Sequence, residues 1–435
     1  MPEAAASNDT RSAGSGASRP AQSDVALLEG RLRPYPWGSR TALAELTGRP
    51  SPSPRPEAEL WFGAHPEAPS ILADSGAGGT DGTECADLLT RISLDPAGQL
   101  GETAPDGRLP FLLKLLAADQ SLSLQAHPTR EQAVEGFARE NAEGIPTGSP
   151  NRNYKDDNHK PELLVALTRF EALAGFRPVE RTRALLEALG VAELERYTDL
   201  LSGTVGDAEG LRAVVTTWIS LPVHRRLELI EVVLDACRAL AARSDVAPWM
   251  TGSARAALEL SEQHPGDAGI LVSLLLNHVV LSPGEALFLS AGNLHAYLRG
   301  TGVEIMANSD NVLRGGLTTK HVDVPELMKV VDFTPVADPV QLPGEDGVFA
   351  TPVPEFELRS VGGHGADRSD GSDRAGDAVA VHGPAIVLAV YGNVEVAWCD
   401  AAPLTLTPGQ AAWVPASATE VTATGAGHYF VATVG

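Results

Sequence analysis

Cysteine is scarce in this chain, which carries three in 435 residues: Cys85, Cys237 and Cys399. They lie far apart, are odd in number and form no C-x-x-C pair. This pattern excludes a disulfide framework and a thiolate-bound zinc. It is typical of a protein that works in a reducing cytoplasm, and a cytoplasmic location is therefore expected.

Basic residues are also few, with 33 Lys and Arg against 56 Asp and Glu and a net charge of −23. Nucleic acids and anionic membranes bind basic surfaces, so neither is an expected partner. No stretch approaches the ~20 apolar residues that span a bilayer. Residues 1–23 have neither a basic start nor an apolar run, so a disordered tail is expected there rather than a secretory signal.

The stretch 123–128, Ser-Leu-Gln-Ala-His-Pro, carries polar side chains at every second position. Side chains two apart on a strand point to the same face. Ser123, Gln125 and His127 therefore share one wall, while the residues between them face the other way. By itself this pattern favours a strand end with a polar rim.

Three later motifs add groups that bind metals and anions. They are 158–163 (NHKPEL) with His159, Lys160 and Glu162, 283–297 (PGEALFLSAGNLHAY) with His295, and 308–317 (NSDNVLRGGL) with Asp310 and Arg314. Gln125, His127, Glu162 and His295 together form a mixed nitrogen and oxygen ligand set. Such a set suits a catalytic divalent metal with an open position, zinc being the first candidate. Structural zinc sites are usually closed and rich in cysteine, so catalysis is favoured over bracing.

These four blocks resemble the type I phosphomannose isomerase family, the zinc-dependent mannose-6-phosphate isomerases of the cupin superfamily. The resemblance extends from about Tyr35 to about Phe333, with the blocks in the same order. It implies one zinc ion per chain, bound by the four ligands above, and a catalytic role for Arg314. It also implies reversible isomerisation of mannose 6-phosphate and fructose 6-phosphate, which feeds mannose metabolism and GDP-mannose synthesis.

Moving a proton between adjacent carbons through an enediol requires a base near neutral pH and groups that stabilise negative oxygen. Arg314 keeps its charge and is a durable partner for an enediolate or a phosphate. Lys160, His159, Asp310 and Glu304 are the candidate proton carriers, and the sequence does not choose among them. For His159, a hydrogen-bonded role that holds the neighbouring metal ligand is at least as good.

The expected substrate-binding residues are Trp37, Lys114, Ser123 and Tyr297. Lys114 stands in the apolar run LPFLLKLL (109–116), where a lysine needs an anion or a cavity, or else reaches the strand edge. Trp37 belongs to an aromatic turn and is as well explained by core packing. His65, at a strand end, is a further candidate that a surface hydrogen bond explains equally well.

The chain as a whole is expected to be mainly β, with two cupin-like jelly-roll barrels and an α-helical insertion. Residues 24–178 and 269–335 are assigned to a catalytic barrel. Apolar residues at helical spacing assign 179–268 to an inserted helical domain. Residues 336–435 are expected to form a second barrel without metal, because PGQAAWVPA (408–416) echoes PGEALFLSA (283–291) but places Glu420 where the first copy has His295. A monomer that binds a small phosphosugar is the expected assembly.

Two other functions remain open. Two histidines and a carboxylate also suit iron(II), so a metal-dependent cupin oxygenase is one alternative, which oxygen uptake would reveal. The glutamine ligand and the nearby basic residues speak against it. A non-catalytic sugar-phosphate-binding cupin is the other, and a single-turnover conversion of bound sugar phosphate separates it from an enzyme.

Overall fold

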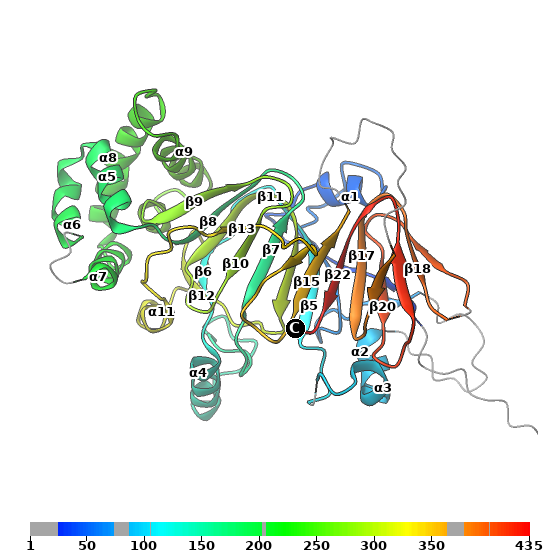
Figure 1. Ribbon diagram of the computed structural model, residues 1–435. Coiled ribbons are helices and arrows are strands. Elements are labelled where there is room, and N and C mark those ends of the chain that lie inside the picture. The colour runs from blue at the N-terminus through cyan, green and yellow to red at the C-terminus, as the bar shows by residue number, and fades with distance from the viewer. Residues whose placement is uncertain (1–24, 74–86, 105, 202–205, 363–377, 400) are drawn as a thin grey trace, which may run out of the picture.

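The computed structural model describes residues 25–73, 87–104, 106–201, 206–362, 378–399 and 401–435. The expected tail at 1–23 lies outside these residues. Within them the strands form three sheets, and the helices gather mainly at one end of the molecule (Figure 1). The chain is therefore mainly β with a helical segment, as expected. None of the described helices is long and apolar enough to cross a membrane.

The largest sheet has eleven strands and is organised around β11, which is 13 residues long. Its strands are β2 (Arg31–Arg33), β3 (Glu59–Phe62), β5 (Phe111–Ala118), β6 (Leu124–Ala126), β7 (Glu162–Ala166), β8 (Phe170–Phe176), β9 (Leu276–Leu281), β10 (Ala286–Leu289), β11 (His295–Ala307), β12 (Leu313–Gly316) and β13 (Val340–Gln341). The later part of β11 pairs with β5 and β7, and its beginning pairs with β6 and β8. This single strand thus joins the two groups of strands that carry the predicted ligands.

Strand β5 explains why the apolar run at 109–116 tolerates a lysine. Phe111, Leu113 and Leu115 belong to a large core shared with the second sheet, so they lie on one face. Lys114 alternates with them and points to the opposite face, which lines a cavity. The strand is buried along its whole length, and the lysine marks its inner side.

The other two sheets pack against each other. The seven-stranded sheet contains β14 (Val348–Phe349), β15 (Glu357–Val361), β22 (His428–Thr433), β17 (Ala385–Tyr391), β20 (Ala411–Val414), β1 (Ala26–Glu29) and β4 (Ile71–Leu72). The four-stranded sheet contains β16 (Val379–Val381), β21 (Val421–Thr424), β18 (Val394–Ala397) and β19 (Leu404–Leu406). Along β17, Ile386 and Leu388 face the core shared with the eleven-stranded sheet, while Val387 and Ala389 face the four-stranded sheet.

Strand pairing crosses the expected domain limits in both directions. Strands β1 and β4 hydrogen-bond within the sheet built mostly from residues after 347. Strand β13, which lies after residue 336, pairs instead with β10 in the eleven-stranded sheet. In both larger sheets the strand order has two ends within the described residues, so the pairing does not close either of them into a barrel. Two complete barrels are therefore not observed.

The helical segment lies between β8 and β9, where the apolar spacing predicted it. It comprises α5 (Val179–Leu189), η1 (Ala192–Leu194), α6 (Glu195–Leu200), α7 (Asp207–Ile219), α8 (Val223–Ala241), α9 (Pro248–Gln263) and α10 (Gly269–Ser273). Its apolar face shares a core with Leu124, Ala126 and Leu294. The helices thus cover the outer face of the strands whose inner face carries Gln125 and His295.

The remaining helices are short, apart from α4. They are α1 (Ala42–Leu46), α2 (Leu88–Leu94), α3 (Pro96–Leu100), α4 (Arg130–Ala142) and α11 (Val324–Val330). Helix α4 begins with a reciprocal capping box between Thr129 and Gln132, which satisfies two backbone N–H groups at its start. The described residues between 70 and 107 form strand β4 and helices α2 and α3.

Candidate metal centre and adjoining cavity

Gln125 lies at the centre of a row of side chains that crosses three strands. Strand β6 runs between β11 and β12, and Gln125 is the register partner of both His295 and Arg314. Opposed residues in antiparallel strands have Cβ atoms about 5 Å apart and share a face. Leu124 and Ala126 face the opposite way into the helical core, as their alternation predicted.

His127, Glu162 and His295 form a compact buried group. The Nε2 atoms of His127 and His295 each lie 3.4 Å from a different oxygen of the Glu162 carboxylate. The possible ligand atoms of the three residues lie within 4.8 Å of one another, and it is the one such cluster of His, Cys, Asp and Glu found in the described residues. Glu162 comes from the start of β7 and His127 from the end of β6, so the group joins the two halves of the eleven-stranded sheet.

The hydrogen bonds behind the two imidazoles fix which nitrogen faces the carboxylate. His127 Nδ1 lies 2.6 Å from the Asn311 carbonyl oxygen, and His295 Nδ1 lies 2.9 Å from the Asn293 carbonyl oxygen. A carbonyl oxygen only accepts, so each Nδ1 carries the proton and each Nε2 keeps its lone pair. Hydrogen bonds of this kind orient metal-binding histidines.

The buried group contains atoms that a cation would satisfy. His127 Nε2 and Glu162 Oε2 have no hydrogen-bond partner in the described part of the chain. Buried polar atoms are normally paired. The Gln125 amide nitrogen lies 3.3 Å from His295 Nε2, so this amide adjoins the same space. Two imidazole nitrogens, a carboxylate and an amide fit a divalent metal with nitrogen and oxygen ligands.

The protonation states of these groups also suit a metal. Burial opposes ionisation of Glu162, but the effect of neighbouring groups, led by the Lys160 ammonium, outweighs it, and the pKa of this carboxyl lies well below its usual range. Lys160 Nζ lies 3.1 Å from Glu162 Oε1. Burial lowers the pKa of His127 to about 4, so the imidazole is neutral near pH 7. Metal ligands must be deprotonated, and both residues meet this condition.

A cavity of about 730 Å³ opens beside this group. It is lined by many residues, among them eight that the sequence singled out: Trp37, His65, Lys114, Ser123, Gln125, Lys160, Asp310 and Arg314. Within the described residues, no hydrogen bond or ion pair engages the side chain of Arg314, which is half-buried in the cavity wall. Lys155 and Lys320 also line the cavity, so one part of it is rich in positive charge.

Lys114 is held among carboxylates. Its Nζ lies 2.8 Å from Glu304 Oε2 and 3.7 Å from Glu59 Oε1. Burial would lower the pKa of Lys114, but these carboxylates outweigh it and raise the pKa above its ordinary value. Glu59 in turn accepts a hydrogen bond of 2.6 Å from Trp61 Nε1. Lys114 is thus a buried cation with fixed partners and does not reach the strand edge.

Six predicted residues are not among those lining the cavity: the buried metal group His127, Glu162 and His295, and three others. Glu304 is buried behind Lys114, and burial raises its pKa although Lys114 opposes the shift. Tyr297 is also buried, and burial together with the Glu304 and Glu162 carboxylates raises its pKa well above the usual value. His159 has another partner altogether: its Nε2 lies 2.6 Å from Glu355 Oε1. No hydrogen bond between His159 and Glu162 is found in the described residues, so the expected support for that ligand comes from Lys160.

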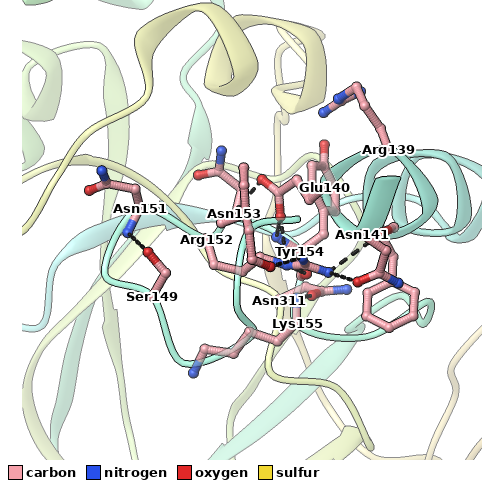
Figure 2. Close-up of polar contacts among 12 residues, drawn as sticks. Arg139, Glu140, Asn141, Ser149, Asn151, Arg152, Asn153, Tyr154, Lys155 and Asn311 are labelled. Carbon is pink, nitrogen blue, oxygen red and sulfur yellow. Dashed lines mark hydrogen bonds and ion pairs between the residues drawn. The ribbon is translucent and has the colours of Figure 1, made fainter. Parts of the chain in front are cut away.

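A loop between α4 and β7 contributes residues that the sequence analysis missed. Figure 2 shows the guanidinium of Arg152 enclosed by Glu140, Asn141 and the backbone of Tyr154. Arg152 Nε lies 2.9 Å from Glu140 Oε2, and the Arg152 side chain is 0% exposed. This buried pair fixes a segment without regular secondary structure, and Asn153 and Lys155 of that segment line the cavity.

Asn311 connects this loop to the metal group. Its side-chain oxygen accepts hydrogen bonds from the backbone N–H groups of Lys155 and Asp156, and its carbonyl oxygen holds His127. Asn311 stands in the motif NSDNVLRGGL, but nothing in the motif indicates that its backbone carbonyl orients a ligand. His65 lies near the cavity with its Nε2 3.7 Å from Asp310 Oδ2.

Comparison with known proteins agrees with this geometry. The profile of the phosphomannose isomerase type I catalytic domain matches residues 26–179. Mannose-6-phosphate isomerase of Escherichia coli is 38% identical over 404 residues, which cover 91% of this chain and 95% of the relative. The enzyme of Mus musculus is 32% identical over 366 residues, covering 76% and 80% respectively.

Solved structures extend the similarity to the whole fold. A zinc-bound mannose 6-phosphate isomerase superposes with a TM-score of 0.80 at 35% identity, covering 94% of this chain and 99% of the other. A single-substitution variant of phosphomannose isomerase from Salmonella typhimurium gives the same TM-score of 0.80 at 34% identity, with the same coverage. The chain belongs to the type I phosphomannose isomerase family.

Proposed function

We propose that this protein is a zinc-dependent mannose-6-phosphate isomerase that interconverts mannose 6-phosphate and fructose 6-phosphate. The observation that carries the proposal is the row in which Gln125 stands between His295 and the unengaged Arg314. In support, Gln125 and Arg314 both line the cavity, and the Gln125 amide adjoins the buried His295. Zinc is the metal in a related structure with a TM-score of 0.80, and the buried ligand set here fits it.

His127, Glu162, His295 and Gln125 would hold the zinc, which supplies Lewis-acid polarisation of a substrate oxygen. The rest of the chemistry belongs to the chain. Arg314 contributes a permanent charge and a planar set of donors for an anionic oxygen of the enediolate or the phosphate. Lys155 and Lys320, which line the same cavity, add positive charge for a dianionic phosphosugar.

Proton transfer is assigned to residues that reach the cavity. Lys160 and Asp310 line it, and both were candidates on sequence grounds. Glu304 and His159 are not among the residues that line it. The proposal therefore narrows the proton carriers to Lys160 and Asp310. Trp37 and Ser123 line the cavity and are assigned as substrate contacts. Lys114 also lines it but is paired with carboxylates, and Tyr297 is buried behind the cavity surface.

A coupled assay on mannose 6-phosphate tests the proposal. The purified protein should form fructose 6-phosphate, lose this activity on treatment with a chelator and regain it on addition of zinc. Oxygen consumption should be absent, which separates an isomerase from an oxygenase. Binding of mannose 6-phosphate without any turnover would refute the assignment and favour a sugar-phosphate-binding protein.

We also propose that the two larger sheets correspond to two cupin-like units that share strands at their borders. The catalytic unit is assigned to 24–178 and 269–335, the inserted helices to 179–268, and the second unit to 336–435. In support, the two echoing sequences both form a turn followed by a strand, β10 and β20. Glu420 is exposed at a turn with φ of +55°, just before β21, whereas His295 is buried at the start of β11.

The second unit should therefore bind no metal. A His127→Ala, His295→Ala double variant of the full chain tests this together with the ligand assignment, because metal analysis should find about one zinc per chain in the parent and none in the variant. Stoichiometric zinc in a well-folded double variant would contradict both assignments. Operation as a cytoplasmic monomer stays a prediction, to be checked by localisation and by sedimentation.

A further inference from the structure

The turn between helices α9 and α10, residues 263–269, contacts two separate walls of the cavity. Gln263 Oε1 accepts a hydrogen bond of 2.8 Å from the backbone N–H of Ser121, and His264 Nε2 lies 2.8 Å from Ser121 Oγ. Ser121 lies just before the strand that carries Gln125. The helical segment thus reaches past the outer face of the sheet and holds a loop at the edge of the cavity.

Asp267 of the same turn holds the opposite wall. Its Oδ1 accepts hydrogen bonds from the backbone N–H groups of Gly269 at 2.7 Å and Leu317 at 2.8 Å. Its Oδ2 accepts a longer one of 3.3 Å from Thr318. Leu317 and Thr318 lie between Arg314 and Lys320 in the sequence. The carboxylate therefore binds the middle of the loop that carries both of these cavity-lining cations.

The backbone of Gly316 and Leu317, next to the Asp267 carboxylate, has an unusual conformation. Leu317 has a φ of +53°, which non-glycine residues adopt only when their surroundings enforce it. Leu317 is buried, and its N–H points at the Asp267 carboxylate. Gly316 has a φ of +143°, and a Cβ built there would lie 2.8 Å from Asp267 Oδ1, so the close approach requires glycine. A strained backbone beside a cavity is a common feature of functional sites.

We propose that Asp267 is a positioning residue through which the inserted helices fix the 314–320 loop, so that Arg314 and Lys320 are held ready for the phosphorylated substrate. The proposal rests on the proposed isomerase function and assigns a role to the helical segment. Asp267 itself is not among the residues lining the cavity, and it acts on the substrate through the loop. Its removal should therefore affect substrate binding more than the chemical step.

Kinetics of Asp267→Ala and Asp267→Asn with mannose 6-phosphate test the proposal. The alanine variant should raise KM by about tenfold, with a smaller change in kcat and unchanged zinc content, because the loop loses the two hydrogen bonds from Leu317 and Thr318 that fix it. The asparagine variant keeps an acceptor oxygen for Leu317 and should recover most of the parent KM. Asp245→Ala is the matched control, because Asp245 is an exposed residue of the helical segment that pairs with Arg243.

Hydrogen exchange gives a readout that does not depend on activity. In Asp267→Ala the amides of Leu317 and Thr318 should exchange faster than in the parent, with the exchange of β11 unchanged. If the alanine variant fails to fold, Asp267→Asn takes its place in the test. A KM above that of the parent, with unchanged zinc content, then supports the proposal, and a KM equal to that of the parent contradicts it. An unchanged KM in an active, zinc-loaded Asp267→Ala variant would overturn the proposal. A parent that does not turn over mannose 6-phosphate would instead refute the proposed function, and with it the role of the loop in holding that substrate.

Discussion

Arg314→Ala is the substitution for which the structure makes the sharpest forecast. The guanidinium is half-buried, and the described residues give it neither a hydrogen bond nor an ion pair. Burial lowers its pKa, so the folded protein holds a charge that its surroundings do not compensate. Truncation therefore breaks no native polar contact and removes an uncompensated charge, so the free energy of unfolding should not fall.

Catalysis should respond very differently. Arg314 on β12 lies directly opposite Gln125 on β6, and Gln125 adjoins the metal group. Removing one preorganised donor from an oxyanion site typically costs 10²–10³-fold in kcat, which is about 2.7–4 kcal/mol of transition-state stabilisation. We expect a loss of this size for Arg314→Ala. Arg314→Lys should recover little, because a point charge does not reproduce a planar fork of donors.

The assay is the coupled conversion of mannose 6-phosphate, combined with thermal unfolding and zinc analysis of the same preparations. Arg225→Ala is a suitable control, since Arg225 is exposed on α8 in an ion pair with Glu228. A structural arginine would give an early-melting alanine variant with little specific loss of turnover. A folded, zinc-loaded Arg314→Ala enzyme with near-normal kcat would refute the reasoning.

Three further outcomes follow from buried or paired charges. Lys114→Met should lower the free energy of unfolding by about 3–5 kcal/mol, measured by chemical denaturation, because its two buried carboxylate partners lose their cation. Glu140→Ala should cost a similar amount, about 3–5 kcal/mol, by leaving Arg152 buried without its carboxylate. For Glu171, a hydrogen bond from His278 leads the causes that lower its pKa from 4.5 to about 2. This folded-state pKa is depressed, so the stabilising effect is present above pH 4.5 and is lost as pH falls toward 2, and the stability difference between parent and Glu171→Gln should vanish over that range.

The shared face of Gln125 and His127 could be predicted from a local pattern, whereas Glu162 and His295 were assigned from separate motifs and from the family resemblance. Alternation along one short strand puts Gln125 and His127 on one face, and the structure places the neighbours of Gln125 in the helical core. The apolar run around Lys114 likewise predicted a lysine that faces an interior opening. In each case the two-residue period of a strand determines which face of the sheet a side chain points to. A polar or charged side chain on that face then indicates that a partner or an opening lies beside it.

Partners far apart in sequence could not be predicted in the same way. His159 and Glu355 are separated by 196 positions, and only the packing of the second sheet against the first brings them together. The same packing recruits β1 into a sheet formed mostly by the end of the chain. Asn311 escaped notice for another reason, because its contact with His127 uses a backbone carbonyl, which every residue possesses. The pattern of side chains in a sequence does not predict contacts made by the backbone.

The overall charge of −23 opposes the approach of a phosphorylated substrate, but the cations that line the cavity reverse this effect locally. Burial, followed by the charges of Arg314 and Lys155, lowers the pKa of Lys320, so these three cations act on one another. No ion pair within the described residues occupies the side chain of any of the three. Mutual repulsion among unpaired cations raises the free energy of the empty protein and is relieved when an anion enters between them. The same three side chains therefore disfavour the free state and favour a dianionic ligand.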